Sequence, residues 1–145
     1  MATYFTEEQE LPFSTDQMFN LVADVARYPE FIPWCLAARV QQQNDTLMIA
    51  DLVVGYKAFR EKYTSRITLT RPLKIRVILE EGPLTFLDSE WVFETLSSQR
   101  CRVKLRLSFE FRSKIKQALM STLFDEAAKK MMQAFTRRAH TLYKS

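Results

Sequence analysis

The feature that most limits how this chain can fold is an alternation of apolar and polar residues between residues 35 and 112. A period of two is typical of strands that have one dry face and one wet face. Short turn signals interrupt the alternation, so neighbouring strands are expected to pair antiparallel. The clearest dry face carries Cys101, Val103, Leu105, Leu107, Phe109 and Phe111. We predict strands at 35–43, 46–54, 57–70, 73–81, 85–96 and 100–112.

A long helix is predicted to follow these strands. Residues 114–143 contain neither Gly nor Pro, and apolar residues recur there at helical spacing. Because the dry face of a sheet needs a cover, we expect this helix to lie across it. The predicted inward stripe comprises Ile115, Leu119, Leu123, Ala127, Met131, Ala134, Phe135 and Leu142, widened by Met120, Phe124, Ala128 and Met132.

The first part of the chain adds one strand, one helix and one turn. A strand is predicted at 4–11, and Ser14 is placed to cap a helix that runs to about Ala26, with Gln17 completing a capping box. Two prolines restrict the segment from Tyr28 to Trp34 to a compact turn or a short helical turn. The whole chain, 1–145, is expected to form one α+β domain: a curved antiparallel sheet of about seven strands wrapped around a long C-terminal helix.

The residue types argue against catalysis. The chain has one histidine, His140, placed near the end of the terminal helix, and its two cysteines, Cys35 and Cys101, have no obvious histidine partner. No spacing typical of a metal site is present. We therefore expect no enzyme activity, no catalytic residue, no metal and no required cofactor. The N-terminus does not read as a signal peptide and no apolar run reaches the ~18 residues of a membrane span, so a cytoplasmic location is expected.

Inward-facing large residues have two interpretations. They either line a ligand cavity or fill the space as an ordinary core, and residue type does not decide between these. A void of ~400 Å3 left empty would cost about 10 kcal/mol, so a large cavity should shrink or hold a lipid. The candidate ligand contacts are Trp34, Tyr63, Trp91, Phe109, Leu123 and Met131.

Glu61 is the most unusual of the predicted inward residues. It falls on the dry face between Phe59 and Tyr63, where a carboxylate is costly unless it is paired or protonated. One interpretation makes it a polar contact for a ligand head group. The other makes it the partner of an arginine from a loop, or turns it to solvent through a bulge.

Two surface features also have a functional and a structural interpretation. The apolar turn with Tyr28, Phe31 and Ile32 is either a lid that dips into a bilayer or plain packing over the open end of the sheet. The wet face is either a basic surface for anionic lipid or ribosomal RNA, or is neutralised by acidic residues on the strand at 85–96. The basic residues predicted to stay uncompensated are Arg60, Lys62 and Arg66.

Several local sequences, in their order along the chain, resemble a known family. They are Tyr28-Pro29-Glu30-Phe31-Ile32-Pro33-Trp34-Cys35, the segment 59–66, Glu81-Gly82-Pro83-Leu84 leading to Trp91-Val92-Phe93, and Phe109-Glu110-Phe111. This set resembles the START/polyketide-cyclase-like helix-grip superfamily, to which the birch-allergen-like proteins belong. Within it, the chain is most similar to the coenzyme Q-binding START-domain family.

The resemblance implies a function as well as a fold. Members of this family are ubiquinone-binding proteins that support respiratory electron transport, and a bacterial branch is described as a ribosome-association toxin that hinders subunit joining. The resemblance therefore implies a carrier of ubiquinone or a related polyprenyl lipid with peripheral contact to an anionic membrane, at the bacterial inner membrane. The alternative is a toxin that binds the large ribosomal subunit. DNA is not an expected partner.

Overall fold

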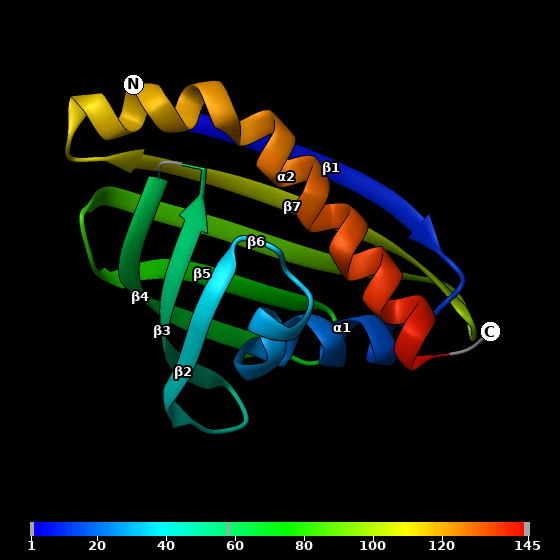
Figure 1. Ribbon diagram of the computed structural model, residues 1–145. Coiled ribbons are helices and arrows are strands. Elements are labelled where there is room, and N and C mark those ends of the chain that lie inside the picture. The colour runs from blue at the N-terminus through cyan, green and yellow to red at the C-terminus, as the bar shows by residue number, and fades with distance from the viewer. Residues whose placement is uncertain (1, 58, 144–145) are drawn as a thin grey trace.

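The sheet contains seven strands, and all neighbouring pairs are antiparallel. The computed structural model describes residues 2–57 and 59–143. The strand order is β1-β7-β6-β5-β4-β3-β2, so the N-terminal strand closes the sheet beside β7 (Figure 1). The predicted α+β fold, with seven antiparallel strands and a long C-terminal helix, is confirmed. The strands are β1 Thr3–Leu11, β2 Cys35–Gln43, β3 Leu47–Tyr56, β4 Phe59–Thr70, β5 Lys74–Glu81, β6 Leu84–Ser97 and β7 Arg100–Phe111.

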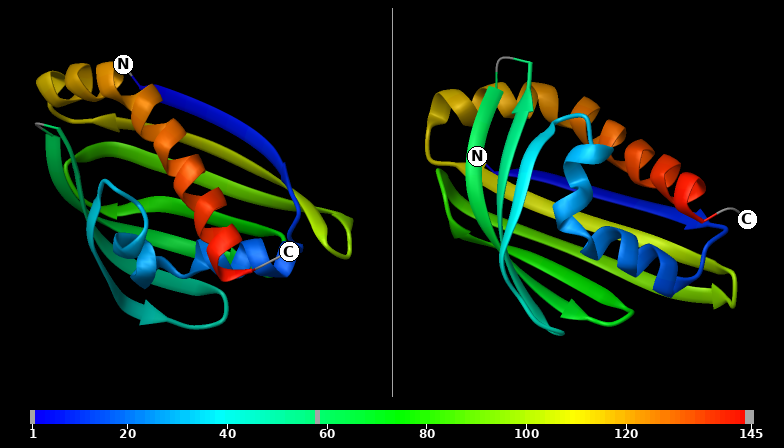
Figure 2. Two further views of the ribbon diagram at one scale, coloured as in Figure 1. Left: turned by 45° about the vertical axis from the view of Figure 1, so that its right-hand side comes forward. Right: turned by 60° about the horizontal axis from the view of Figure 1, so that its bottom comes forward.

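Irregular pairing accompanies the curvature of the sheet. The register shifts within β2, between Thr64 and Ser65 of β4, and near both ends of β6. Such bulges bend a strand and increase its local twist. The sheet therefore has a concave face, which holds the core, and a convex face that is exposed (Figures 1 and 2).

The helix α1, Thr15–Ala23, begins with the predicted capping box. The Ser14 hydroxyl accepts a hydrogen bond from the Gln17 backbone N–H at 3.1 Å, and the Gln17 side chain accepts one from the Ser14 N–H at 2.9 Å. The helix ends earlier than predicted. A 3-10 helix, η1 Val25–Glu30, takes up the segment with Pro29, which agrees with the predicted short helical turn.

The helix α2, Lys114–Leu142, crosses the concave side of the sheet diagonally, with α1 and η1 beside its C-terminal half (Figures 1 and 2). Its inward stripe differs from the prediction in the first turns and at Leu142, which is exposed. Ile115 is 83% exposed and Leu119 is also exposed, while Leu123 is half-buried. The buried positions in this half are Gln117, Met120, Phe124, Ala127 and Ala128.

Gln117 explains this rotation of the stripe. Its side-chain oxygen accepts a hydrogen bond from the Phe111 backbone N–H at 2.9 Å, and its amide nitrogen donates to the Thr3 hydroxyl at 2.9 Å. A residue that points at the sheet turns Ile115 and Leu119 away from it, because each lies two positions, or about 200°, from Gln117. No helix in the described part of the chain is long and apolar enough to cross a membrane.

Candidate ligand-binding cavity

An outer cavity of about 130 Å3 lies between the N-terminal half of α2 and the concave face of the sheet. Its walls come from α2, from the β3–β4 hairpin and from β6 and β7, and the aromatic rings of this region pack edge to face. Phe109 and Phe124, for example, lie 5.1 Å apart. The lining residues are Trp34, Val54, Gly55, Tyr56, Phe59, Glu61, Tyr63, Leu84, Leu87, Leu107, Phe109, Phe111, Met120, Phe124 and Ala127.

An inner cavity of about 120 Å3 lies deeper, between the sheet, η1 and the C-terminal half of α2. Four residues, Trp34, Tyr63, Leu87 and Leu107, line both cavities and so mark the boundary where the two adjoin. The other lining residues of the inner cavity are Val22, Val25, Tyr28, Ile32, Leu52, Ser65, Ile67, Ile75, Val77, Ser89, Trp91, Leu105, Met131 and Phe135.

The predicted contact residues fall around these cavities with one exception. Trp34 and Tyr63 line both, Phe109 lines the outer cavity, and Trp91 and Met131 line the inner one. Leu123 lines neither, which corrects its predicted inward position. The reason is the rotation of α2 by Gln117, which places Phe124 and Ala127 at the wall instead.

Glu61 lies at the wall of the outer cavity and is 11% exposed. Its carboxylate accepts a hydrogen bond from the ammonium group of Lys116, in the first turn of α2. Three interpretations of this residue were open from the sequence: a ligand contact, an ion pair with an arginine from a loop, or exposure to solvent through a bulge. The structure forms an ion pair, but the cation is a lysine that comes from the covering helix.

Polar contacts also join α2 to the β3–β4 hairpin beside the outer cavity. Glu126 lies 3.6 Å from the Lys57 ammonium and 3.2 Å from that of Lys130, and Lys130 donates to the Tyr56 hydroxyl at 3.4 Å. Further along the helix, the indole N–H of Trp34 donates to the Ala127 carbonyl at 3.2 Å. These contacts lie along the gap between the helix and the hairpin, beside the outer cavity.

Burial keeps the acidic groups near the inner cavity protonated. It raises the pKa of the Cys35 thiol to about 11 and places the pKa of the Tyr28 and Tyr63 hydroxyls well above their usual value. Tyr28 also donates a hydrogen bond to the Val22 carbonyl. At neutral pH these groups are uncharged, so the surroundings of the inner cavity carry hydrogen-bonding groups without charge.

One hydroxyl in the inner cavity has no hydrogen-bond partner. Ser65 is 1% exposed, and among the described residues its Oγ finds neither donor nor acceptor. A buried polar group left unpaired costs about 1–3 kcal/mol. The alternation along β4 places Ser65 on the same face as Glu61, but an alternating pattern does not show whether a hydroxyl is paired.

The predicted lid is packed into the protein. Tyr28 and Ile32 line the inner cavity, and Ile32 is 2% exposed. The Phe31 ring lies 5.2 Å from that of Phe135 and beneath the Arg138 guanidinium. In this conformation the segment packs over the open end of the sheet, and the contact of Phe31 and Ile32 with a bilayer stays a prediction.

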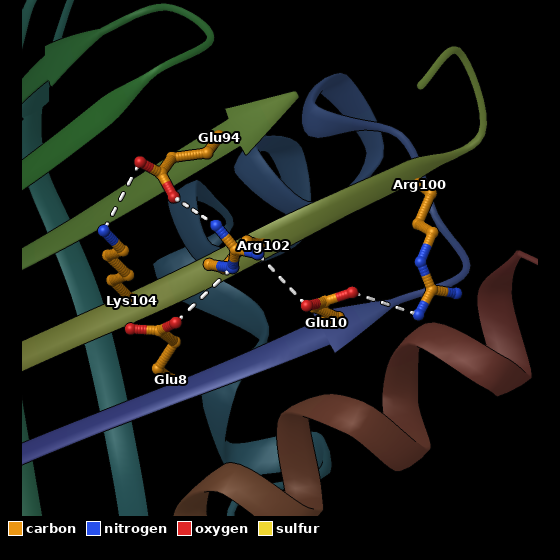
Figure 3. A network of polar contacts seen from close by, with 6 residues as sticks. All are labelled: Glu8, Glu10, Glu94, Arg100, Arg102 and Lys104. Carbon is orange, nitrogen blue, oxygen red and sulfur yellow. Dashed lines mark hydrogen bonds and ion pairs between the residues drawn. The ribbon is translucent and has the colours of Figure 1, made fainter. Parts of the chain in front are cut away.

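Ion pairs neutralise much of the convex face. Arg102 of β7 lies within 3.4 Å of Glu8, Glu10 and Glu94, which come from the strands on either side (Figure 3). Lys74, Arg76, Lys104 and Arg106 likewise pair with acidic residues of β6.

The three basic residues predicted to be uncompensated differ in their surroundings. Arg66 pairs with Glu80 of β5 at 2.8 Å, so the prediction that Arg66 is uncompensated is wrong. The prediction considered only the acidic residues of the strand at 85–96, whereas this acid comes from β5. Arg60 and Lys62 make no ion pair with any described residue within 4.0 Å. Asp51 on β3 lies close enough to Lys62 for the lysine to help lower its pKa, after the larger effect of a hydrogen bond from Thr64.

The chain is similar to known proteins over nearly its full length. Residues 11–136 match the family described as polyketide cyclase/dehydrase and lipid transport. The ribosome association toxin RatA of Pseudomonas aeruginosa is 37% identical over 143 residues, which cover 99% of both chains. The mitochondrial coenzyme Q-binding protein COQ10 homolog B of Xenopus laevis is 34% identical over 143 residues, covering 96% of this chain and 59% of that protein.

Solved structures share the architecture. The Zhui aromatase/cyclase of Streptomyces sp. R1128 superposes with a TM-score of 0.86, covering 100% of this chain and 98% of that one. The two sequences are 17% identical, so this likeness concerns the fold alone.

Proposed function

The chain belongs to the polyketide cyclase/dehydrase and lipid transport family, and from that premise we propose that it is a non-catalytic binding protein for a polyprenyl quinone or a similar lipid. The ligand would occupy the two adjoining cavities beneath α2. The protein would act as a carrier or chaperone in support of respiratory electron transport, from the cytoplasm and at the surface of the inner membrane. The relative named as a coenzyme Q-binding protein supports this ligand class.

The adjoining apolar cavities are the observation on which the proposal rests. An apolar cavity of about 150 Å3 is large enough to bind benzene, so cavities of about 130 and 120 Å3 each suit a ring or a short branched chain segment. Each buried methylene contributes ~0.8 kcal/mol, so a prenyl chain would gain from entering. The four shared wall residues place the two cavities side by side, and a ligand that extended through both would pass between them.

The ionisable groups around the cavities support binding without catalysis. A cyclase or hydrolase needs an acid and a base that contact the same substrate. Glu61 is engaged by Lys116, while Tyr28, Tyr63 and Cys35 have raised pKa values that remove them as bases at neutral pH. His140 is exposed at the far end of α2, against the ring of Phe13.

Lipid content tests the binding proposal. Protein purified from quinone-producing cells should release a prenyl lipid into organic solvent, detected by mass spectrometry. Ala127→Phe would place a ring inside the outer cavity and should reduce the recovered lipid at least fivefold, whereas Ala118→Phe, on the exposed side of the same helix, should leave it unchanged. Wild-type protein that is free of lipid in repeated preparations would contradict the proposal.

A second candidate function is binding to the large ribosomal subunit in the manner implied by the name of the Pseudomonas aeruginosa relative. Arg60 and Lys62 favour it, because they are basic residues of the convex face whose charges no described acid pairs within 4.0 Å. Phosphate groups attract such unpaired cations, and the attraction depends on salt. This function uses the convex face and the first uses the concave one, so separate variants distinguish them.

A further inference from the structure

The inner cavity contains a hydrogen-bonding group that the chain itself leaves unused. Ser65 Oγ is buried and has no partner among the described residues, although it lies at the wall of a cavity. Buried polar groups are paired in the great majority of cases, and an unpaired one calls for an explanation. A partner supplied from outside the chain, by a molecule in the cavity, provides that explanation.

Two polar groups of the outer cavity differ from Ser65 in having partners. The Glu61 carboxylate is bonded to Lys116, and the Trp34 indole N–H is bonded to the Ala127 carbonyl. A ligand oxygen that bonded to either of these two groups would have to displace its contact. In the inner cavity it would meet a hydroxyl that is free to donate.

The geometry of β4 brings a second hydroxyl near Ser65. Tyr63 and Ser65 are two positions apart on one strand, so their side chains stand on the same face about 7 Å apart along it. Tyr63 lines both cavities, whereas Ser65 lines the inner one only. Ser89 of β6, also buried, adds a third hydroxyl to the inner wall. Hydroxyl groups are thus present from the boundary between the cavities inward.

We propose that the inner cavity is the subsite for the oxygen-bearing ring of the ligand, with the Ser65 hydroxyl donating a hydrogen bond to a ring oxygen. The inference rests on the binding function proposed above and adds an orientation to it. The ring lies inside, and the prenyl chain runs through the outer cavity toward the gap between α2 and the β3–β4 hairpin. The opposite orientation would leave Ser65 unpaired and would place the ring oxygens beside the Glu61 carboxylate, which cannot donate a hydrogen bond when ionised and is already paired with Lys116.

The size of the inner cavity agrees with this orientation. At about 120 Å3 it is somewhat smaller than the apolar cavity that binds benzene, so it accepts one six-membered ring with small adjustments of its walls. Trp91 and Phe135 belong to those walls and offer aromatic faces to a planar ring.

Two probes that differ in ring oxygens test the inference. Decyl-1,4-benzoquinone and decylbenzene share ring size and chain length, but only the quinone accepts hydrogen bonds. With delipidated protein, Ser65→Ala should raise the dissociation constant of the quinone about tenfold, which corresponds to ~1.4 kcal/mol. It should change the dissociation constant of decylbenzene by less than about twofold. Calorimetric titration measures both constants.

The control is Ser108→Ala. Ser108 is buried like Ser65 but lies in β7 among the residues of the convex face, away from both cavities, and its removal should alter neither constant. The melting temperature of the ligand-free protein provides a second readout. Removing an unpaired hydroxyl should raise it or leave it unchanged, whereas removing a hydroxyl that is bonded within the protein should lower it.

The outcomes separate the inference from the function on which it rests. If neither probe binds the wild-type protein, the binding function fails and the inference fails with it. If both probes bind the wild-type protein, and Ser65→Ala weakens the binding of both equally or of neither, the orientation is overturned while the binding function stands. A fall in the melting temperature of ligand-free Ser65→Ala would also overturn the inference.

Discussion

At the scale of the single residue, burial sets the chemistry of the Cys35 and Cys101 thiols. Both side chains are buried, and desolvation raises the pKa of each from 9.0 to about 11. A thiol reacts as its thiolate, so neither residue is a nucleophile at neutral pH. This agrees with a binding protein in which the cysteines serve as apolar core residues.

The raised thiol pKa values predict how stability depends on pH. The folded state favours the protonated thiol. Each thiol therefore contributes fully to the free energy of unfolding below pH 9, and this contribution is lost as the pH rises toward about 11. The loss should approach ~1.4 kcal/mol per pH unit for each thiol. Urea unfolding at several pH values between 8.5 and 10.5 measures the slope, and the double variant Cys35→Ala, Cys101→Ala should show a shallower one. Equal slopes in the two proteins would contradict this account.

The residue scale also shows where inference from sequence ends. The alternation in β4 is enough to place Glu61 and Ser65 on the dry face, because side chains of a strand alternate regardless of the rest of the fold. Whether each has a partner depends on residues far away in the sequence. Lys116 reaches Glu61 from α2, and nothing described reaches Ser65. No local pattern contains that information.

At the scale of elements, α2 depends on a buried polar residue for its orientation. Gln117→Leu would remove the acceptor for the Phe111 backbone N–H and the donor to the Thr3 hydroxyl. The Phe111 N–H would then be buried without this partner. We expect a loss of about 1–3 kcal/mol in the free energy of unfolding and faster amide exchange in the first turns of the helix.

The matched control is Ser121→Ala in the same half of α2. Ser121 also contacts the Thr3 hydroxyl, at 3.3 Å, but it is exposed, so its loss should cost less than about 0.5 kcal/mol. Urea unfolding and hydrogen exchange measured by mass spectrometry report both effects. If Gln117→Leu stabilises the helix instead, the stripe is set by its apolar residues and not by Gln117.

The same helix explains why the elements were predictable and the site only partly so. Thirty residues without Gly or Pro predict a helix whatever its surroundings, and its apolar spacing predicts a buried side. The rotation of that side is a tertiary property. A stripe drawn through Ile115, Leu119 and Leu123 is as regular as one through Met120, Phe124 and Ala127. Contacts with residues distant in the sequence, such as those of Gln117 with Phe111 and Thr3, select the second.

At the scale of the whole molecule, charge is distributed unevenly over the convex face. The formal net charge is +4. Cross-strand pairs among β1, β6 and β7 (Figure 3), and between β5 and β6, locally neutralise many of the basic side chains on this face. Exposed pairs of this kind contribute little to stability, about 0–1 kcal/mol each. Their clearer consequence is that many cations of this face are paired, whereas Arg60 and Lys62 have no ion-pair partner within 4.0 Å in the described part of the chain.

This distribution gives the second candidate function a specific test. If the large ribosomal subunit binds the convex face, Arg60→Glu with Lys62→Glu should weaken co-sedimentation at least tenfold at ~0.1 M salt and reduce the salt slope of binding by about two. Lys129→Glu with Arg137→Glu makes the same charge change at exposed positions of α2 and should have little effect. Equal weakening by both pairs would indicate attraction by net charge alone, and weakening by neither would remove the ribosome from consideration. Ala127→Phe, which closes the outer cavity, should not affect this binding, so lipid content and co-sedimentation assign the two faces independently.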